Sequence, residues 1–360
     1  MANRERLIRT LMDLIRIDSP TGEEDAIDQE VTGRLEGLGF RVSHDSFNNV
    51  IARLDGAGEP VMLSAHLDTV EPGRGIKPVL DGDVLRSDGS TILGGDCKAG
   101  VTIVLEALTS VLESGARHLP VEVVFSRAEE GGLVGVHHLD FNQVSARRGV
   151  VFDGEGPVNR VTVAAPAQNV VQAHIHGRAA HAGVEPEKGI SAVVIAAHIL
   201  TRLPLGRIDA ETTANIGRVE GGLKRNIIPE TAFLDGEIRS RDQAKLEQYT
   251  QQFRNVFDQV AAQYPEAKIS PDIKNSYQSY HVGESHPTVA MISRALVAAG
   301  LEPRLEGSGG GSDANVFFEH GIVALPVGIG VRSFHTKEET ALIPEVLQGA
   351  EFCERIIRGV

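Results

Sequence analysis

The chain has 360 residues, a formal net charge of −14, 41% hydrophobic residues and 39 glycines. This length exceeds that of most single cores and predicts two domains. The acidic balance excludes nucleic acid and anionic membranes as main partners, because both bind basic faces. Two cysteines, Cys97 and Cys353, make no disulfide framework, and no apolar signal segment or membrane-spanning run is present. Together these features predict a cytoplasmic protein.

The first 167 residues show the apolar spacing of an α/β domain. Two amphipathic helices open the chain, the first carrying Leu7, Leu11 and Leu14 along one face. Two runs, 121–126 and 149–152, are short and almost continuously apolar, as buried parallel strands are. In chain order we expect a strand over 41–54, a strand over 61–65, a loop or hairpin over 71–90, a helix over 101–113, and strands over 121–126 and 149–152.

From residue 168 the pattern changes to that of a second domain. We expect a strand over 168–177, a helix over 189–203, strands over 212–219 and 231–239, a helix over 242–263 and a strand over 267–275. This β-α-β-β-α-β order is the ferredoxin-like split motif. A helix over 287–299, a glycine loop, a short helix, a strand over 322–328 and a last helix from about 344 then resume the α/β pattern. We therefore expect an α/β domain made of 1–167 and 276–360, interrupted by an α+β domain over 168–275.

Acids and histidines follow the predicted strands of the first domain. The positions are His66 with Asp68, Glu129 with Glu130, Asp153, His335 and, at a glycine-rich helix start, Asp96. Ligands of open α/β sheets bind beyond the carboxyl ends of the strands, so these side chains should meet at one edge. Two histidines and three carboxylates suit two divalent ions, zinc more readily than manganese or cobalt. A shared carboxylate would hold such ions about 3.5–4 Å apart.

The chemistry of these residues also suggests a division of roles. Asp68, two residues after His66, is placed to fix the tautomer of that histidine. Glu129 and Glu130 are adjacent, and on extended backbone they would point in opposite directions. One of them can then bind metal while the other faces the attacking water as general base. Each signal alone has a plainer interpretation, such as a helix N-cap for Asp96, but their joint placement favours the metal site.

Five motifs in this order resemble those of a known family. They are SAHLDTV (64–70), GGDCKAG (94–100), SRAEEGGLVG (126–135), VFDGEG (151–156) and the late His335. The chain resembles the dizinc exopeptidases that include aminoacylase, carboxypeptidase G, succinyl-diaminopimelate desuccinylase and tripeptidase T, and it is most similar to the tripeptidase T branch. The resemblance covers nearly the whole chain. It implies a zinc-exopeptidase-like α/β/α catalytic domain with an inserted ferredoxin-like domain that serves as a lid and dimerisation surface.

The resemblance implies a role for each motif residue, with His66 and Asp153 on one metal, Glu130 and His335 on the other, and Asp96 bridging the two. Glu129 would be the general base and proton shuttle, and Asp68 would orient His66. Family members with aspartate at the position of Asp153 tend to be aminopeptidases, whereas deacylases and carboxypeptidases tend to have glutamate.

Cys97 departs from the family pattern, which has aspartate or asparagine after the bridging acid. The family's peptide bond at this point is typically cis. The substitution makes the hydrogen bonding around the bridging acid differ from that of the family, and we expect Cys97 to be structural and not a ligand.

The inserted domain and the late glycine loop supply the substrate contacts that the resemblance implies. His181 would bind the scissile carbonyl oxygen in the transition state, often from the neighbouring subunit, and Arg239 would bind a substrate carboxylate with its planar fork. Asn215 and Asn226 are family-like substrate contacts. For His181 the plainer interpretation is a surface-turn histidine, and the substrate role is favoured over it. Asn215 and Asn226 fit a strand-end or turn role as well as they fit a substrate contact.

The glycine loop SGGGSDAN (308–315) has no following Gly-Lys-Ser/Thr, so a phosphate-binding loop is not indicated. Its backbone, with Gly310 and Ser312, is expected to line the pocket for a substrate terminus.

The sequence therefore predicts a homodimeric two-metal peptidase that releases the N-terminal residue of short peptides. An N-acyl amino acid deacylase or a carboxypeptidase of the same family is one alternative. A non-catalytic binding protein that keeps the fold is another.

Overall fold

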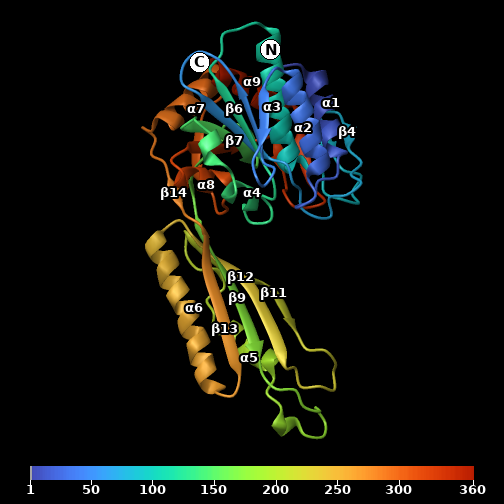
Figure 1. The fold of residues 1–360 in the computed structure, drawn as a ribbon, viewed down its shortest axis with the longest axis vertical. Helices are drawn as coiled ribbons and strands as arrows, with labels where there is room; N and C mark the ends of the chain where they lie inside the picture. The colour runs from blue at the N-terminus through green and yellow to red at the C-terminus, as the bar shows by residue number, and fades with distance from the viewer. Residues whose placement is uncertain (1) are drawn as a thin grey trace. The chain divides into compact units, whose positions relative to one another are not determined.

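The computed structural model describes residues 2–360, which fall into two units. The first contains the chain up to Val163 together with His281–Gly307 and Ser312–Val360, so that both chain ends lie in it (Figure 1). The second contains Ala164–Tyr280 and Ser308–Gly311. The expected limits of the inserted domain, 168 and 275, lie inside the long segment of the second unit.

A mixed sheet forms the centre of the first unit. Its order is β1-β2-β6-β3-β7-β16-β8-β14, with β15 beside β8. The strands are β1 (Arg41–His44), β2 (Val50–Leu54), β3 (Val61–His66), β6 (Val121–Ser126), β7 (Arg148–Gly154), β8 (Arg160–Ala165), β14 (Tyr280–His281), β15 (Arg304–Gly307) and β16 (Val323–Gly328). The four strands β6, β3, β7 and β16 run parallel. Every residue of β3 and β6 is buried, which explains why these strands read as continuous apolar runs.

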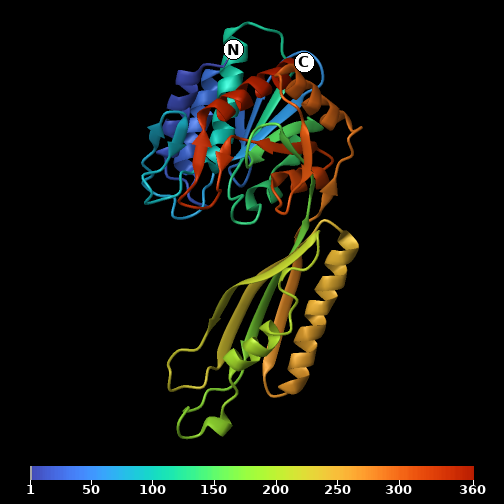
Figure 2. The same cartoon turned by 180° about the vertical axis from the view of Figure 1, so that it is seen from behind.

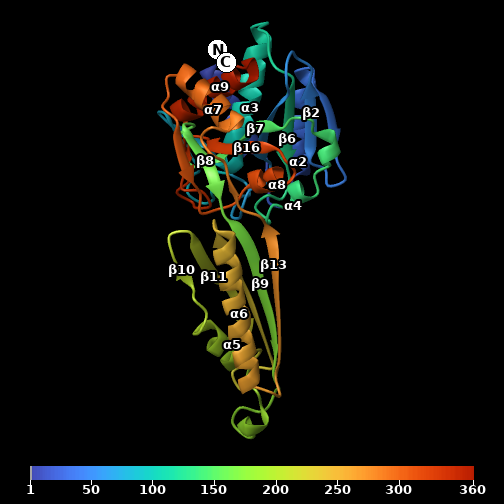
Figure 3. The same cartoon turned by 90° about the vertical axis from the view of Figure 1, so that its left-hand side faces the viewer.

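Helices cover both faces of this sheet and complete an α/β/α arrangement. They are α1 (Arg4–Ile15), α2 (Asp25–Gly37), α3 (Gly95–Glu113), α4 (Val134–His137), α7 (Pro287–Ala298), α8 (Asp313–Glu319) and α9 (Ile343–Arg358), with a 3₁₀ turn at Phe141–Gln143. Helix α3 packs on β3 and β7 and against α1 and α9. Helix α7 packs on α9 and on β7 and β16, whereas α8 packs on α4 and β16; Figure 3 shows α7 beside α9 and α8 beside α4. The predicted fold class is confirmed.

Two local predictions for this unit were wrong. The expected strand over 41–54 is an antiparallel hairpin of β1 and β2. Its turn forms because the Asp45 carboxylate accepts hydrogen bonds from the backbone N–H groups of Phe47 and Asn49, while Asn48 takes a left-handed φ of 65°. The helix expected from residue 101 begins at Gly95 and contains non-helical dihedral angles at Asp96 and Cys97, which apolar spacing cannot reveal.

A second, small sheet in this unit has the order β17-β18-β5-β4. Its strands are β4 (Val79–Asp81), β5 (Val84–Arg86), β17 (Val331–Arg332) and β18 (Thr340–Leu342). The segment expected to be a loop or hairpin, 71–90, contains the β4–β5 hairpin. The connection between β17 and β18 carries His335, so this small sheet joins the late histidine to the body of the unit.

The second unit has the ferredoxin-like order that the sequence predicted. Its strands are β9 (Ala167–His176), β10 (Gly206–Arg207), β11 (Thr212–Gly221), β12 (Thr231–Ser240) and β13 (Lys268–Tyr277), and its helices are α5 (Ala192–Leu200) and α6 (Gln243–Gln263), with a 3₁₀ turn at Pro186–Lys188. The strands are ordered β10-β11-β12-β9-β13 and all the pairs are antiparallel. Among residues 2–360, the outer edge of β11 pairs only with the two-residue β10, at Thr213 and Ala214, so most of this edge is open.

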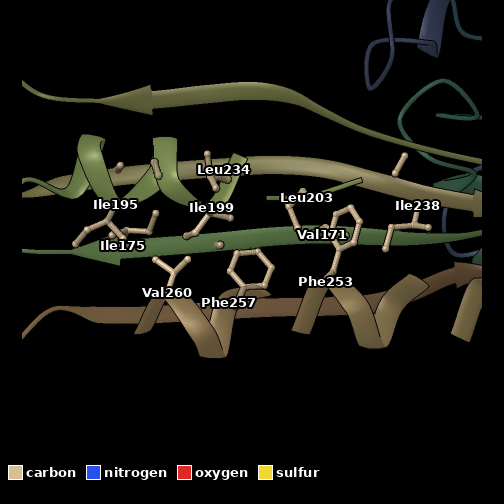
Figure 4. Close-up of a cluster of buried hydrophobic side chains, with 14 of the residues drawn as sticks. Val171, Ile175, Ile195, Ile199, Leu203, Leu234, Ile238, Phe253, Phe257 and Val260 are labelled. Carbon is tan, nitrogen blue, oxygen red and sulfur yellow. The ribbon is translucent and has the colours of Figure 1, made fainter. Parts of the chain in front are cut away.

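Both helices of the second unit pack on one face of its sheet, and Figure 2 shows α5 in front of that face. Phe253 of α6 points toward Val171 of β9, and Phe257 and Val260 of α6 point toward the same strand, as Figure 4 shows. Alternate residues of β9 are buried on this face because side chains of a strand alternate between its two sides. This unit therefore has a hydrophobic core of its own.

No helix within residues 2–360 has both the length and the apolarity needed to cross a membrane.

We predict that Phe253→Ala lowers the free energy of unfolding by about 3–5 kcal/mol, because Phe253 is fully buried in the core of the second unit. Guanidinium unfolding followed by circular dichroism measures this change. Val297→Ala, at a side chain that is 64% exposed, is the matched control and should change the value by less than about 0.5 kcal/mol. Equal effects of the two substitutions would contradict the core described here.

Candidate metal centre

Three neighbouring elements bring acids and histidines to the carboxyl edge of the parallel strands. His66 is the last residue of β3 and pairs in register with Ser126, the last residue of β6. The turn after β6 carries Glu129 and Glu130, and Asp153 lies near the end of β7. The structure therefore places these residues at one edge of the sheet, as the sequence predicted from the ends of the strands.

The Asp96 carboxylate lies between the two histidines. Its Oδ1 atom is 3.1 Å from Nε2 of His66, and its Oδ2 atom is 3.1 Å from Nε2 of His335. Asp153 Oδ1 lies 3.4 Å from the same nitrogen of His66, and Glu130 Oε1 lies 2.8 Å from that of His335. By these contacts Asp153 lies with His66 and Glu130 lies with His335, and Asp96 faces each of these pairs with one oxygen.

The donor atoms of these groups fit two divalent ions. Ligand atoms about 2.0–2.2 Å from a tetrahedral zinc ion lie about 3.3 Å from one another, close to the separations found here. Glu130 Oε1 is buried and accepts no hydrogen bond from residues 2–360, although it lies beside a histidine nitrogen. Such a placement is expected of two ligands of a shared cation. Imidazole nitrogens and carboxylate oxygens also suit manganese and cobalt, so the donor set leaves the metal open.

Burial, together with the neighbouring charged groups, shifts the pKa values of the acids in this cluster when no cation is bound. Burial raises the pKa of the Asp153 carboxyl to about 7, and it raises the pKa of Glu129 well above its usual range, with neighbouring carboxylates adding to the effect. Burial also opposes ionisation of Asp96, but hydrogen bonds from His335 and His66 outweigh it and lower its pKa to about 2. Cations bound at this cluster would displace protons from Asp153 and Glu129, the acids whose pKa is raised.

Asp68 holds both His66 and the turn after β6. Nδ1 of His66 lies 3.0 Å from the main-chain oxygen of Asp68 and 3.3 Å from its Oδ1, so the Nε2 atom is left to face the cluster. The Asp68 carboxylate, which is fully buried, accepts hydrogen bonds from the backbone N–H groups of Glu129 and Glu130 at 2.9 and 3.1 Å, and from the hydroxyl of Thr21 at 2.7 Å. Sequence reasoning placed Asp68 at the histidine but missed its contacts with the turn.

The sequence pattern predicts that Glu129 and Glu130 point in opposite directions, because side chains alternate along a strand. This reason was wrong. Both residues lie in a turn and not on extended strand, so strand alternation does not separate their side chains. Their backbone N–H groups point to the same carboxylate, and one carboxylate oxygen of each lies within 4.8 Å of the other and of a ring nitrogen of His66. The tertiary contacts of the turn decide where each carboxylate points.

Cys97 is buried beside this cluster. Its thiol donates a hydrogen bond to the main-chain oxygen of Phe152 at 2.7 Å, and burial raises the pKa of the thiol well above its usual value. The Asp96–Cys97 peptide bond is cis, as the resemblance implied. The sulfur lies within 4.8 Å of ligand atoms of His66, Asp96 and Asp153, but a neutral thiol bonded to a carbonyl oxygen supports the structural role predicted for it.

Sequence reasoning missed Glu339, which holds the turn into α3 and the non-helical start of that helix, where Asp96 lies. Its fully buried carboxylate accepts hydrogen bonds from three backbone N–H groups, those of Leu93, Gly94 and Asp96. Burial raises the pKa of Glu339 to about 7, although these hydrogen bonds favour its charged form. In the sequence Glu339 stands in the charged run KEET, which resembles a solvated surface, so no local signal identifies it.

The substrate residues predicted in the second unit lie at two ends of its sheet. His181 is exposed in a turn that lies beside residues 226–228, where Ala182 N donates to Asn226 O at 3.0 Å. Arg239 is near the other end, where it pairs in register with Gln168, whereas Thr231 pairs with His176. The eight residue steps of β9 from Gln168 to His176 separate these ends by roughly 26 Å, at about 3.3 Å per step.

The remaining predicted contacts are divided between the two units. Asn215 is exposed on β11 and pairs in register with Glu237, whose carboxylate lies 2.8 Å from Arg239 Nε. Gly310 lies close to Arg239, since a Cβ atom added to it would be 3.7 Å from Nη1 of that arginine. Ser312 belongs to the first unit and forms the N-cap of α8 in a capping box. Arg239 thus already has an internal carboxylate partner.

Known proteins resemble this chain along its whole length. Residues 170–265 match the M20 model described as a peptidase dimerisation domain, and residues 49–165 match the model of peptidase family M28. The crystal structure of aminopeptidase PepT from Bacillus cereus is 36% identical, with a TM-score of 0.87 over 99% of both chains. A tripeptidase structure from Staphylococcus aureus is 31% identical, with a TM-score of 0.92 over 99% of this chain and 98% of the other. The uncharacterized protein YqjE of Bacillus subtilis is 37% identical over 99% of both chains.

We predict that the protein binds two zinc ions per chain and that Asp96→Asn binds at most one. The amide that replaces the carboxylate keeps one acceptor oxygen and cannot serve both histidine groups as a ligand. Elemental analysis of dialysed protein measures the ratio. Zinc should raise the melting temperature of the metal-free protein and raise that of the variant less. Asp55→Asn, at a carboxylate that is 82% exposed, is the control and should keep two ions; two tightly bound ions in Asp96→Asn would contradict the shared ligand.

Proposed function

Because the chain belongs to the M20 family of peptidases, we propose that it releases the N-terminal residue of short peptides by hydrolysis. The observation that carries this proposal is the Asp96 carboxylate facing His66 and His335 with separate oxygens, with a further acid, Glu129, beside the cluster. The full-length similarity to an aminopeptidase and a tripeptidase supports the substrate class. Aspartate at position 153 agrees with it, since the deacylases and carboxypeptidases of the family tend to have glutamate there.

The chemistry of the site follows from the placement of its acids. His66, Asp96, Glu130, Asp153 and His335 would hold two divalent ions, zinc being favoured, which would polarise the scissile carbonyl and lower the pKa of a water molecule in the site. Glu129 would take a proton from this water and pass it to the leaving amine. Asp68 would keep the His66 ring in one tautomer and hold the backbone of Glu129 in place.

The second unit supports a homodimer. Its family model describes a dimerisation domain, and several of its apolar side chains are exposed: Val184, Val193, Val194, Leu205, Val219 and Leu223. Val193 lies against Gly221 at the end of β11, the strand whose outer edge is mostly open. An open strand edge beside exposed apolar side chains favours pairing with a second copy. We propose that this surface forms the dimer.

The separation of His181 from Arg239 bears on how they would bind a substrate. A short peptide cannot reach both ends of a sheet roughly 26 Å apart within one chain. We propose that His181 acts on the scissile carbonyl in the site of the partner subunit, where it would stabilise the oxyanion. Arg239, with Asn215 and Gly310 near it, would bind a substrate carboxylate at the other end. This carboxylate would replace that of Glu237, with which Arg239 pairs in the structure. The role proposed for Asn226 follows that of His181, beside which it lies, and Ser312 stays a predicted pocket residue of the first unit.

We predict that zinc-loaded protein cleaves a free tripeptide and loses this activity when the amino terminus is acetylated. Liquid chromatography of the products measures each rate. Loss on carboxyl amidation as well would assign a carboxylate-binding residue such as Arg239. Preference for the acetylated form would contradict the aminopeptidase proposal and favour the deacylase or carboxypeptidase alternative.

We predict that Glu129→Gln lowers kcat by about 10²–10⁴-fold with two ions still bound, because the amide cannot accept the proton of the attacking water. Steady-state kinetics and elemental analysis of the same preparation provide the two readouts. Glu155→Gln, at the single glutamate of the VFDGEG motif, which is exposed in the structure, is the control. Unchanged kcat in Glu129→Gln would remove Glu129 from the mechanism.

We predict that His181→Ala and Glu129→Gln, each nearly inactive, complement one another when mixed as dimers. In a mixed dimer one site has its own Glu129 and receives His181 from the partner. If chains exchange at random, about one quarter of the wild-type activity returns, since half of the dimers are mixed and each has one complete site. Activity measured after co-refolding gives the result; no recovery in proven mixed dimers would place His181 in the site of its own chain.

A further inference from the structure

The turn that carries Glu129 depends on side chains from other segments. Four consecutive backbone N–H groups, those of residues 127–130, donate to side-chain oxygens: Arg127 N to Asn49 Oδ1 at 3.0 Å, Ala128 N to Glu24 Oε1 at 3.0 Å, Glu129 N to Asp68 Oδ1 at 2.9 Å and Glu130 N to Asp68 Oδ2 at 3.1 Å. These acceptors come from three segments that are distant in the sequence. The position of the turn is therefore set by tertiary contacts.

Glu24 contributes more of these contacts than its place at the start of α2 requires. Its side chain is 1% exposed and gives no capping hydrogen bond to the helix. Oε1 accepts from Ala128 N and from Gly22 N, at 3.0 and 2.9 Å. Oε2 accepts from Nε and Nη2 of Arg127, at 3.2 and 3.0 Å. Donors thus face both oxygens, so the site requires a carboxylate, because an amide offers one oxygen and would present N–H groups to the other donors.

The backbone next to Glu129 needs such support. Ala128 has a left-handed φ of 50°, a region that residues with a Cβ atom rarely occupy. Ala128 N is held by Glu24, and Ala128 O accepts from Val134 N at 3.1 Å. If the first of these contacts were lost, the turn would be free to relax at the residue that directly precedes Glu129. The direction of the Glu129 carboxylate would change with it.

We propose that Glu24 is a positioning residue for the hydrolysis, which acts by fixing the turn at Ala128 and so the direction of Glu129. This inference rests on the role proposed for Glu129 as general base. Glu24 itself is not among the residues that form the metal groups. Its carboxylate pairs with Arg127, which also pairs with the exposed Asp25, so it supports the turn with a cationic partner beside it.

Glu24→Gln tests the proposal in the zinc-loaded enzyme with a free tripeptide. We expect kcat to fall about 10–100-fold, while KM and the two bound ions stay within twofold of wild type. Glu23→Gln is the matched control, because it makes the same chemical change one residue away at a side chain that is 62% exposed and pairs with Arg74. Its kinetics should stay at the wild-type values. A kcat of Glu24→Gln equal to that of the control, or a loss that follows loss of metal, would overturn the proposal.

A second comparison asks whether Glu24 acts through Glu129. In the Glu129→Gln background, Glu24→Gln should cause no further loss of kcat, because the group it positions is already gone. A further loss as large as that in the wild-type background would mean that Glu24 acts elsewhere and would overturn the proposal. If Glu24→Gln does not fold, Glu24→Asp takes its place, since it keeps both acceptor oxygens and the charge but is one methylene shorter. It should also lower kcat with metal and KM unchanged, and wild-type kcat would overturn the proposal.

These experiments distinguish the role of Glu129 as general base from the positioning role of Glu24. Wild-type kcat in Glu129→Gln would refute the general base and with it the role of Glu24. A strong loss in Glu129→Gln together with wild-type kcat in Glu24→Gln would refute only the positioning role. The proposed peptidase mechanism would then stand without it.

Discussion

The shared carboxylate of Asp96 is the interaction on which the rest of the site depends. It faces His66 at the end of β3 with one oxygen and His335, far along the chain, with the other. For this to happen, the non-helical start of α3, the end of β3 and the turn between β17 and β18 must meet within a few ångströms. The parallel sheet brings the strand ends to one edge, and the small second sheet brings the last histidine to it.

Buried carboxylates hold the loops of this site in place. Asp68 and Glu24 bind backbone N–H groups of the turn after β6, and Glu339 binds those of the loop that carries Asp96. Loops have few backbone partners of their own, and a buried N–H group without an acceptor is costly. The same hydrogen bonds stabilise the charged acids. Each of these two segments is thus fixed without regular helical or strand geometry, and its acidic side chain points into the cluster.

The second unit combines a core of its own with surfaces that suit contact with another copy. Its two helices cover one face of the sheet, and its exposed valines and leucines lie in the loops, on α5 and along β11. His181 and Arg239 lie at opposite ends of this sheet, although the family resemblance gives both of them to one substrate. The length of the strands, which no single residue reveals, makes a dimer the simplest way to reconcile these roles.

The sequence alone determined the order of most helices and strands, the ferredoxin-like insertion and the acids and histidines of the cluster. These follow from apolar periodicity and from the rule that ligands come after parallel strands, which are local patterns. Only the tertiary structure decided the hairpin within 41–54, the early start of α3 and the directions of Glu129 and Glu130. It alone also revealed Glu24 and Glu339, because their partners lie 104 and 243 residues away at Ala128 and Asp96. A carboxylate whose hydrogen-bond donors are so distant looks like any surface charge until the chain has folded.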